Sequence, residues 1–300
     1  MELDLVLRAV MLPAAVVAAV CLALVTSLRS MPMARAVPAV GTLLPVLVSL
    51  AAFRALAVQE GEHFLGGLAP GVSYGWIPTA LLLAAVVAGV VGAGSSPLAV
   101  RAACIAAPAV AFSLLAPPGL RGGEPQAIAA AVAAAASACA VGAFGDLPRA
   151  GFAAWWLALS AASSFPIMAG FAKLGFVAAA LAASVAALGT VSAFRRAVTC
   201  APAMHVAMAT ALGCIAFVGM GYDEAPLPRW CWAAVALSPV GSAVASCLPR
   251  SVPSKVRTAA IVLAPAAVVA AALAAALPLS TEGDVDHDAY AVGGSMAAVP

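Results

Sequence analysis

The segment 199–220, TCAPAMHVAMATALGCIAFVGM, contains the side chains best suited to binding a soft metal ion. Cys200, Met204 and Met208 follow one another at intervals of four residues, so a helix would place them on one face, with His205 beside them. Sulfur and imidazole ligands suit Cu(I) or haem iron. A metal needs several converging ligands, however, and Met and Cys at helical spacing also serve as packing residues. We therefore favour a histidine satisfied within the core, and expect no cofactor.

A second group of possible ligands lies in the longest predicted loop, residues 58–73. Glu60, Glu62 and His63 stand within four residues of one another. Carboxylates with an imidazole can bind a divalent cation or concentrate cationic solutes. The alternative is an acidic surface exposed to water, and both interpretations stay open.

The most polar patch inside any predicted helix is formed by Ser160, Ser163 and Ser164, shortly before Pro166. A proline frees a backbone carbonyl and allows a kink. A kinked helix lined by hydroxyl groups can form an uncharged substrate site at mid-depth in a membrane. Serine and proline are also common where membrane helices touch, so these residues are a candidate ligand site with a packing alternative.

Signatures of catalysis are absent from the sequence. It contains no HExxH, GxSxG or GxGxxG motif and no phosphate-binding P-loop. We therefore expect no catalytic residues and favour a protein that is not an enzyme.

The amino-acid composition indicates which class of fold must position these residues. Of the 300 residues, 65% are hydrophobic and 9% are charged, and the mean hydropathy is +1.10. Soluble domains are about 45–50% apolar and about 25% charged. The chain is therefore expected to be an all-α polytopic membrane protein surrounded by lipid. Its net charge of +2, without a basic cluster, gives no reason to expect a nucleic-acid partner.

A membrane-spanning helix needs about 20 apolar residues. Only residues 170–173 separate the sixth and seventh apolar runs, which predicts a tight helical hairpin. A count of eight or nine spans is the alternative to ten. The ten predicted spans are 9–28, 36–57, 75–94, 98–116, 126–145, 151–169, 174–194, 199–220, 230–248 and 258–279.

The charged residues predict which side of the membrane each loop faces. Nine of the fourteen Lys and Arg fall in or next to loops after odd-numbered spans, and such basic loops stay in the cytoplasm. Eleven of the twelve Asp and Glu fall on the opposite side, and only Asp146 does not. This division predicts both termini outside the cytoplasm, in a membrane of the bacterial plasma (inner) type.

Tryptophan, cysteine and proline add three local expectations. The tryptophans lie at predicted span ends, where we expect them to anchor in the headgroup layer: Trp76, Trp155, Trp156, Trp230 and Trp232. The seven cysteines form no CxxC pair and are expected to be small buried side chains. Five prolines inside spans are expected to kink them: Pro45, Pro108, Pro166, Pro239 and Pro265.

The chain is predicted to form one transmembrane domain, 1–279, and an acidic, Gly-rich, disordered tail, 280–300. A polar segment at 145–149 divides the spans into halves, 1–145 and 150–279. Five spans per half would invert the second half, as in many secondary transporters. In length and span number the chain resembles the ten-helix drug/metabolite transporter superfamily, whose members usually keep both termini in the cytoplasm. No functional residue is carried over from this resemblance.

Three classes of function remain after these observations. The first is a small-solute transporter or permease without a buried carboxylate, because no Asp or Glu lies in the middle of a span. The second is a structural or assembly component of a membrane without a substrate. The third is a membrane-embedded enzyme. Neither a substrate nor an oligomeric state follows from the sequence.

Overall fold

The computed structural model describes residues 11–27, 47, 77–92, 96–115, 120, 122–194, 198–222 and 227–282. All regular structure in these residues is helical, which confirms the predicted all-α class for this part of the chain. The helices are α2 (Leu12–Ser27), α4 (Ile77–Gly92), α5 (Pro97–Leu114), α6 (Gly123–Phe144), α7 (Ala150–Met168), α8 (Ala172–Phe194), α9 (Pro202–Gly221), α10 (Arg229–Ser246) and α11 (Ser254–Glu282).

Local chemistry explains where several of these helices begin and turn. The Ser96 hydroxyl accepts a hydrogen bond of 3.1 Å from the amide of Ala99, capping α5 just before Pro97. Pro202 likewise occupies the first turn of α9. Gly170 connects α7 to α8 at a φ of 79°, a conformation that glycine adopts without strain. The predicted tight hairpin is therefore confirmed.

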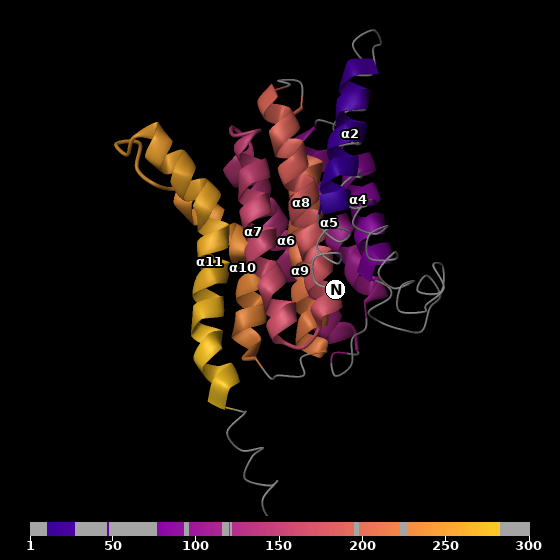
Figure 1. The fold of residues 1–300 in the computed structure, drawn as a ribbon, viewed down its shortest axis with the longest axis vertical. Coiled ribbons are helices and arrows are strands. Elements are labelled where there is room, and N and C mark those ends of the chain that lie inside the picture. Colours follow the sequence, from indigo (N-terminus) through magenta and orange to yellow (C-terminus); the bar gives the residue numbers. More distant parts are fainter. Residues whose placement is uncertain are drawn as a thin grey trace, which may run out of the picture.

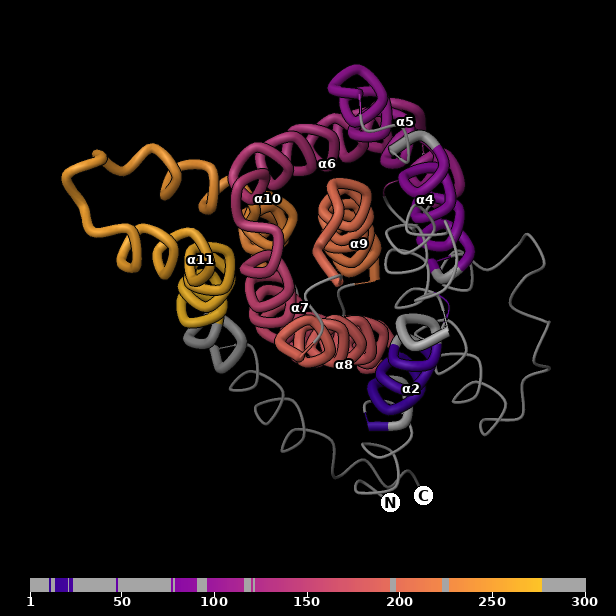
Figure 2. The backbone as a smooth tube through the Cα atoms, turned by 90° about the horizontal axis from the view of Figure 1, so that it is seen from above, coloured from indigo at the N-terminus to yellow at the C-terminus, as the bar shows by residue number. Residues whose placement is uncertain are grey.

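The helices surround one central helix. Figure 2 shows α9 in the middle of a ring formed by α4, α5, α6, α7, α8 and α10, and α9 contacts each of them. In the side view the helices run along a common direction (Figure 1). Outside this ring, α2 packs against α8, while α11 packs against α10 and α7. Segments from both halves of the chain therefore enclose α9.

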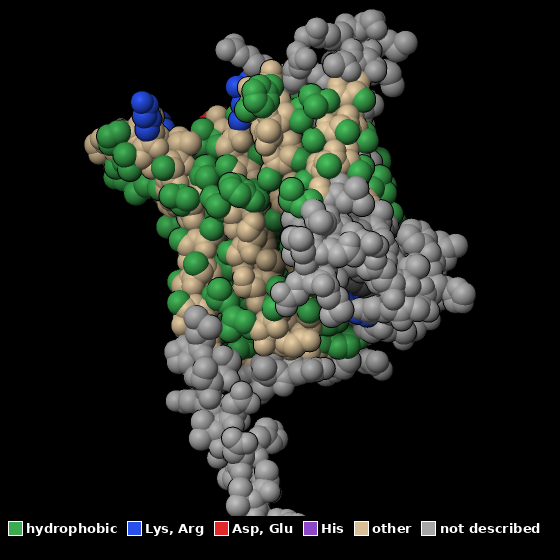
Figure 3. Space-filling model, viewed as in Figure 1, with side chains coloured by type: hydrophobic (Ala, Val, Ile, Leu, Met, Phe, Trp, Pro, Cys, Tyr) green, Lys and Arg blue, Asp and Glu red, His purple; other side chains and the backbone are tan. Residues whose placement is uncertain are grey.

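Burial follows this arrangement. In α9, 94% of the residues in an apolar stretch of 18 residues are buried, whereas only 28% are buried in the corresponding stretch of α11. A helix that is apolar on every side fits either a protein interior or membrane lipid, so the packing of the bundle, and not hydropathy, distinguishes α9 from α11. On the face shown in Figure 3, apolar side chains cover the flanks of the bundle, and the Lys and Arg that are visible lie toward its ends.

Within the described residues, six helices are long and apolar enough to cross a membrane: α5, α6, α7, α8, α9 and the 254–276 part of α11. The chain is therefore an integral membrane protein with a helical bundle. Helices α2, α4 and α10 also overlap predicted spans, but they do not combine the length and the apolar character of these six helices. The predicted span 36–57 lies outside the described residues, apart from residue 47.

The hairpin of α10 and α11 leans away from the rest of the bundle at its tip (Figure 1). Pro239 lies inside α10 and Pro265 inside α11, where each lacks the N–H that would bond to the carbonyl four residues earlier. In both cases a serine hydroxyl donates to that carbonyl instead. Ser238 donates to the carbonyl of Val235 (2.9 Å), and Ser242 to the carbonyl of Ile261 (2.8 Å).

Two expectations about individual side chains are wrong. Trp155 and Trp232 are only 2% and 1% exposed, so they pack inside the bundle instead of anchoring in the headgroup layer. Trp156 and Trp230, in contrast, are exposed. Cys247 is also exposed, although Cys104, Cys200, Cys214 and Cys231 are buried as expected. In addition, α11 continues to Glu282, past the predicted start of the tail at residue 280.

Candidate functional site

His205 is the one buried imidazole among the described residues, and it lies in the first turn of α9. The indole nitrogen Nε1 of Trp155, in α7, donates a hydrogen bond of 2.9 Å to Nδ1 of His205. Because an indole N–H only donates, Nδ1 must act as the acceptor, which makes His205 a neutral imidazole with its proton on Nε2. The histidine is therefore satisfied by a neighbouring helix.

Aromatic and small residues enclose this histidine. The ring of Phe144, at the end of α6, stacks on the imidazole with a centroid distance of 5.1 Å and an angle of 6°. Gly151 leaves the necessary space, because a Cβ atom there would lie 2.5 Å from Cε1 of His205. The group formed by Phe144, Gly151, Trp155, Cys200 and His205 is called the His205 cluster below.

Cys200 reaches the cluster from the segment before α9. Its backbone amide donates a hydrogen bond of 2.6 Å to the carbonyl of Pro148, in the turn between α6 and α7. The Sγ atom of Cys200 lies 3.9 Å from Nδ1 of His205. Burial raises the pKa of the Cys200 thiol, because the apolar surroundings disfavour the thiolate. The cluster therefore joins α6, α7 and α9 at one end of the bundle.

The proposed metal ligands are brought together only in part. Cys200 precedes the first residue of α9, so the expected row of sulfur atoms does not continue along one helix. Met204 and Met208 are buried in α9. The lone pair of Nδ1 is already engaged by Trp155. In the described part of the chain, no three residues of the types His, Cys, Asp and Glu lie close enough to hold a metal.

The serine patch lies on the hairpin of α7 and α8. Ser163 donates a hydrogen bond of 2.7 Å to the carbonyl of Ser160, within its own helix. Gly175 of α8 packs so closely that an added Cβ would lie 2.8 Å from the carbonyl oxygen of Ser163. Ser160 is exposed, Ser164 is half-buried and Pro166 is buried. None of the four residues lines either of the cavities described below.

The third predicted group cannot be placed. Glu60, Glu62 and His63 all lie outside the described residues.

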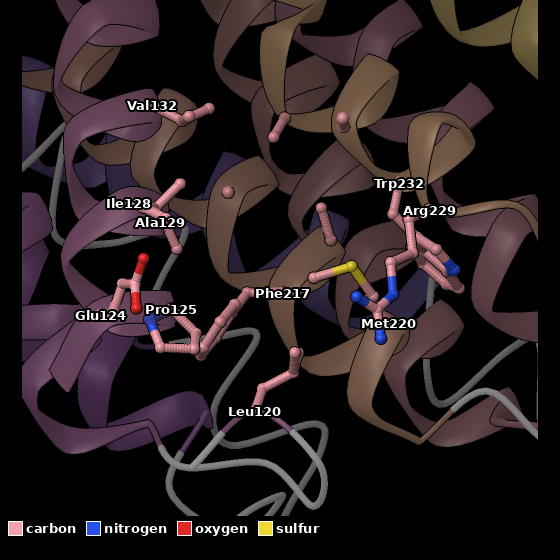
Figure 4. Close-up of a pocket in the computed structure, with 14 residues that line it drawn as sticks. Leu120, Glu124, Pro125, Ile128, Ala129, Val132, Phe217, Met220, Arg229 and Trp232 are labelled. Carbon is pink, nitrogen blue, oxygen red and sulfur yellow. The ribbon is translucent and has the colours of Figure 1, made fainter. Parts of the chain in front are cut away.

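A cavity that the sequence did not indicate lies between α6, α9 and α10, and we call it the α6–α10 slot. It has a volume of about 350 Å³ and is lined almost entirely by apolar side chains. Figure 4 shows Glu124 and Arg229 on opposite sides of it, with Phe217 and Met220 between them. The division of charges along the sequence assigns both Glu124 and Arg229 to the outer side of the membrane. This was the only signal in the sequence that related the two residues to each other. The full lining is Leu120, Glu124, Pro125, Ile128, Ala129, Val132, Gly213, Ala216, Phe217, Met220, Arg229, Trp232, Ala233 and Ala236.

A second, more polar cavity of about 450 Å³ lies between α7 and α8. Arg149, Trp156 and Thr190 contribute its polar groups, and Phe152 and Gly189 form part of its wall. It is near the same end of the bundle as the His205 cluster.

Comparison of the chain with protein-family models, with curated proteins and with solved structures finds no match. Its function must therefore be inferred from the geometry described above.

Proposed function

We propose that the protein is a structural or assembly component of a membrane, built on a filled helical core. The observation that carries this proposal is the position of α9. This helix occupies the centre of the ring, where a solute would cross, and 94% of the residues in its 18-residue apolar stretch are buried. An aqueous path through the described bundle would have to replace α9 or move it.

The buried hydroxyl groups support the same proposal. Ser137, Ser184 and Thr210 each donate to the backbone carbonyl four residues earlier in their own helix. Ser238 and Ser242 bond to the carbonyls that prolines leave free. Hydroxyls used in this way have their own O–H satisfied in a water-free interior and cannot donate it to a substrate.

The proposal includes a topology. We infer ten spans, with the segment 36–57 added to the nine described helices, and five spans in each half of the chain. Both termini would lie outside the cytoplasm, in a plasma membrane of bacterial type, as the charges predict. The lipid bilayer would be the main partner. Neither a nucleic acid nor a catalytic activity forms part of the proposal.

A permease that works by alternating access is the second candidate. It is favoured by the prolines inside ring helices, Pro108 in α5, Pro166 in α7 and Pro239 in α10, since such positions can act as bending points. In this case the five-plus-five arrangement would form an inverted repeat. Transport would require the ring to rock around α9 and open a path along it.

Access of water to α9 distinguishes the two candidates. In variants that retain a single cysteine, we would test the native Cys214 and the substitutions Ala209→Cys and Ala216→Cys, all at buried positions of α9. Ser251→Cys, exposed in the turn between α10 and α11, is the control. Each variant is exposed to a membrane-impermeant methanethiosulfonate reagent from each side of sealed vesicles.

A filled core predicts modification of Ser251→Cys from one side and protection of all three α9 positions from both sides. Modification of an α9 position at a rate within tenfold of the control would contradict the structural proposal and favour the permease. Cys214 needs no substitution in α9, so its result does not depend on how well a new side chain is tolerated.

A further inference from the structure

We propose that the α6–α10 slot binds a zwitterionic phospholipid of the phosphatidylethanolamine class, taken from the surrounding bilayer. One acyl chain would enter the slot. The phosphate would meet Arg229, and the ammonium group would meet Glu124. This site goes beyond the structural role proposed above and does not depend on it.

The body of the slot matches an acyl chain. Ile128, Ala129 and Val132 of α6 line the slot, together with Ala233 and Ala236 of α10. Phe217 and two small residues of α9 complete the apolar lining. A volume of about 350 Å³ is at the lower end of the range for ligand sites, which suits one chain better than a bulky solute.

The slot can be reached from the side of the bundle. Ile128 lines it and is 58% exposed, on the surface of a helix that qualifies as a membrane span. A lipid chain can therefore enter from the hydrocarbon region without leaving the membrane. A water-soluble ligand gains little from such walls, because they offer apolar contacts almost exclusively.

The mouth of the slot carries one charge of each sign. Glu124 lies in the first turn of α6 and Arg229 is the first residue of α10, so both side chains lie at the same end of the bundle, and both are exposed. They line one cavity, yet no ion pair joins them within the described residues. Figure 4 shows them separated by the width of the slot.

Two separated, opposite charges above an apolar slot are complementary to a zwitterionic headgroup. A guanidinium group binds phosphate oxygens through paired N–H donors. A primary ammonium group can donate hydrogen bonds to a carboxylate. A purely anionic headgroup would leave Glu124 without an attractive partner. Trp230, next to Arg229 and 51% exposed, is of the type that lies at headgroup depth.

Native mass spectrometry of the purified full-length protein can test the proposal. The protein is equilibrated in mixed micelles with equal amounts of dioleoyl phosphatidylethanolamine and dioleoyl phosphatidylglycerol, and the retained lipids are counted. We expect one retained phosphatidylethanolamine, with at least a fivefold excess over phosphatidylglycerol. Arg229→Gln and Glu124→Gln should each reduce this excess to less than twofold.

The same two helices provide matched controls at the other end of the bundle. Asp146→Asn follows α6 and Arg250→Gln follows α10, and both native side chains are exposed outside the slot. These controls should keep the wild-type lipid ratio. Equal retention of both lipids by the wild type, or equal ratios in the slot and control variants, would overturn the proposal.

Two further arms identify the source of the headgroup and the role of the apolar walls. Water-soluble phosphoethanolamine, titrated by calorimetry, should give no heat at concentrations where the lipid is retained. Heat equal to that of a short-chain lipid would identify a soluble zwitterion as the ligand and overturn the lipid proposal. Ala233→Phe should reduce lipid retention at an unchanged helical circular dichroism spectrum, and full retention would contradict an acyl chain in the slot.

Discussion

The hydroxyl of Ser242 donates a hydrogen bond of 2.8 Å to the backbone carbonyl of Ile261, across the contact between α10 and α11. Residue 265, which would normally bond to this carbonyl within α11, is proline and has no N–H. Ser242 therefore replaces the backbone donor that Pro265 lacks. The bent hairpin thus keeps its backbone satisfied in a region without water.

This relationship predicts a dependence between two substitutions. Ser242→Ala should lower the free energy of unfolding by about 0.5–2 kcal/mol, because it leaves the Ile261 carbonyl unpaired. In a Pro265→Ala background the restored amide of residue 265 can bond to that carbonyl. The same serine substitution should then cost less than about half as much. Unfolding in mixed micelles, followed by circular dichroism, measures all four proteins of the cycle.

Ser246→Ala is the control for this cycle. Ser246 is exposed and donates within its own helix, to the carbonyl of Ala243. Its substitution should have the same small effect with and without Pro265. If the costs of Ser242→Ala are equal in both backgrounds, the proline is not the reason for this hydrogen bond.

A second prediction concerns the bond from Trp155 to His205. Trp155→Phe keeps an aromatic ring but removes the indole donor, so the buried Nδ1 of His205 keeps only the long 3.9 Å contact with the Cys200 thiol. We expect a loss of about 1–3 kcal/mol in the free energy of unfolding. Trp156→Phe is the matched control, because the adjacent indole is 46% exposed. Equal losses in the two variants would show that the hydrogen bond to His205 does not matter.

A third prediction concerns the space that Gly151 leaves. An alanine Cβ at this position would lie 2.5 Å from Cε1 of His205 and 3.1 Å from Sγ of Cys200. Gly151→Ala should therefore destabilise the bundle by about 1–3 kcal/mol through overpacking. Gly142→Ala, inside α6 where nothing lies within 4 Å, should be neutral or stabilise by up to about 1 kcal/mol. Thermal midpoints in detergent, read by circular dichroism, compare the two.

The sequence was informative about elements whose signal is local. Apolar runs and their polar breaks predicted the α7–α8 hairpin, and its turn at Gly170 lies within the predicted break. The same runs anticipated the positions of nine helices within the described residues. Hydropathy depends on nearby residues along the chain, so it can be read without knowing which helices touch.

The candidate sites depended on contacts between distant segments, and the sequence does not state these. The unusual composition of 199–220 drew attention to this segment, but it did not show that its helix is central or that Trp155 would satisfy His205. Trp155 and Trp232 were expected at the lipid surface because position along a helix does not reveal which face is buried. Arg229 and Glu124 line the same slot only because α6 packs beside α10.

A fourth prediction concerns the chemistry of Cys200. Because burial raises the pKa of its thiol, the reactive thiolate is a smaller fraction at any pH below that pKa than it would be in water. Alkylation of Cys200 by N-ethylmaleimide at pH 8 should therefore be at least tenfold slower than that of the exposed Cys247, as measured by peptide mass spectrometry. The Cys200 rate should rise with pH and approach the Cys247 rate after unfolding in dodecyl sulfate.

Trp155→Phe should also raise the alkylation rate of Cys200, because the loss of the bond to His205 loosens the packing around the thiol. Equal rates for the two cysteines in the folded wild-type protein would mean that the His205 cluster is open to the reagent.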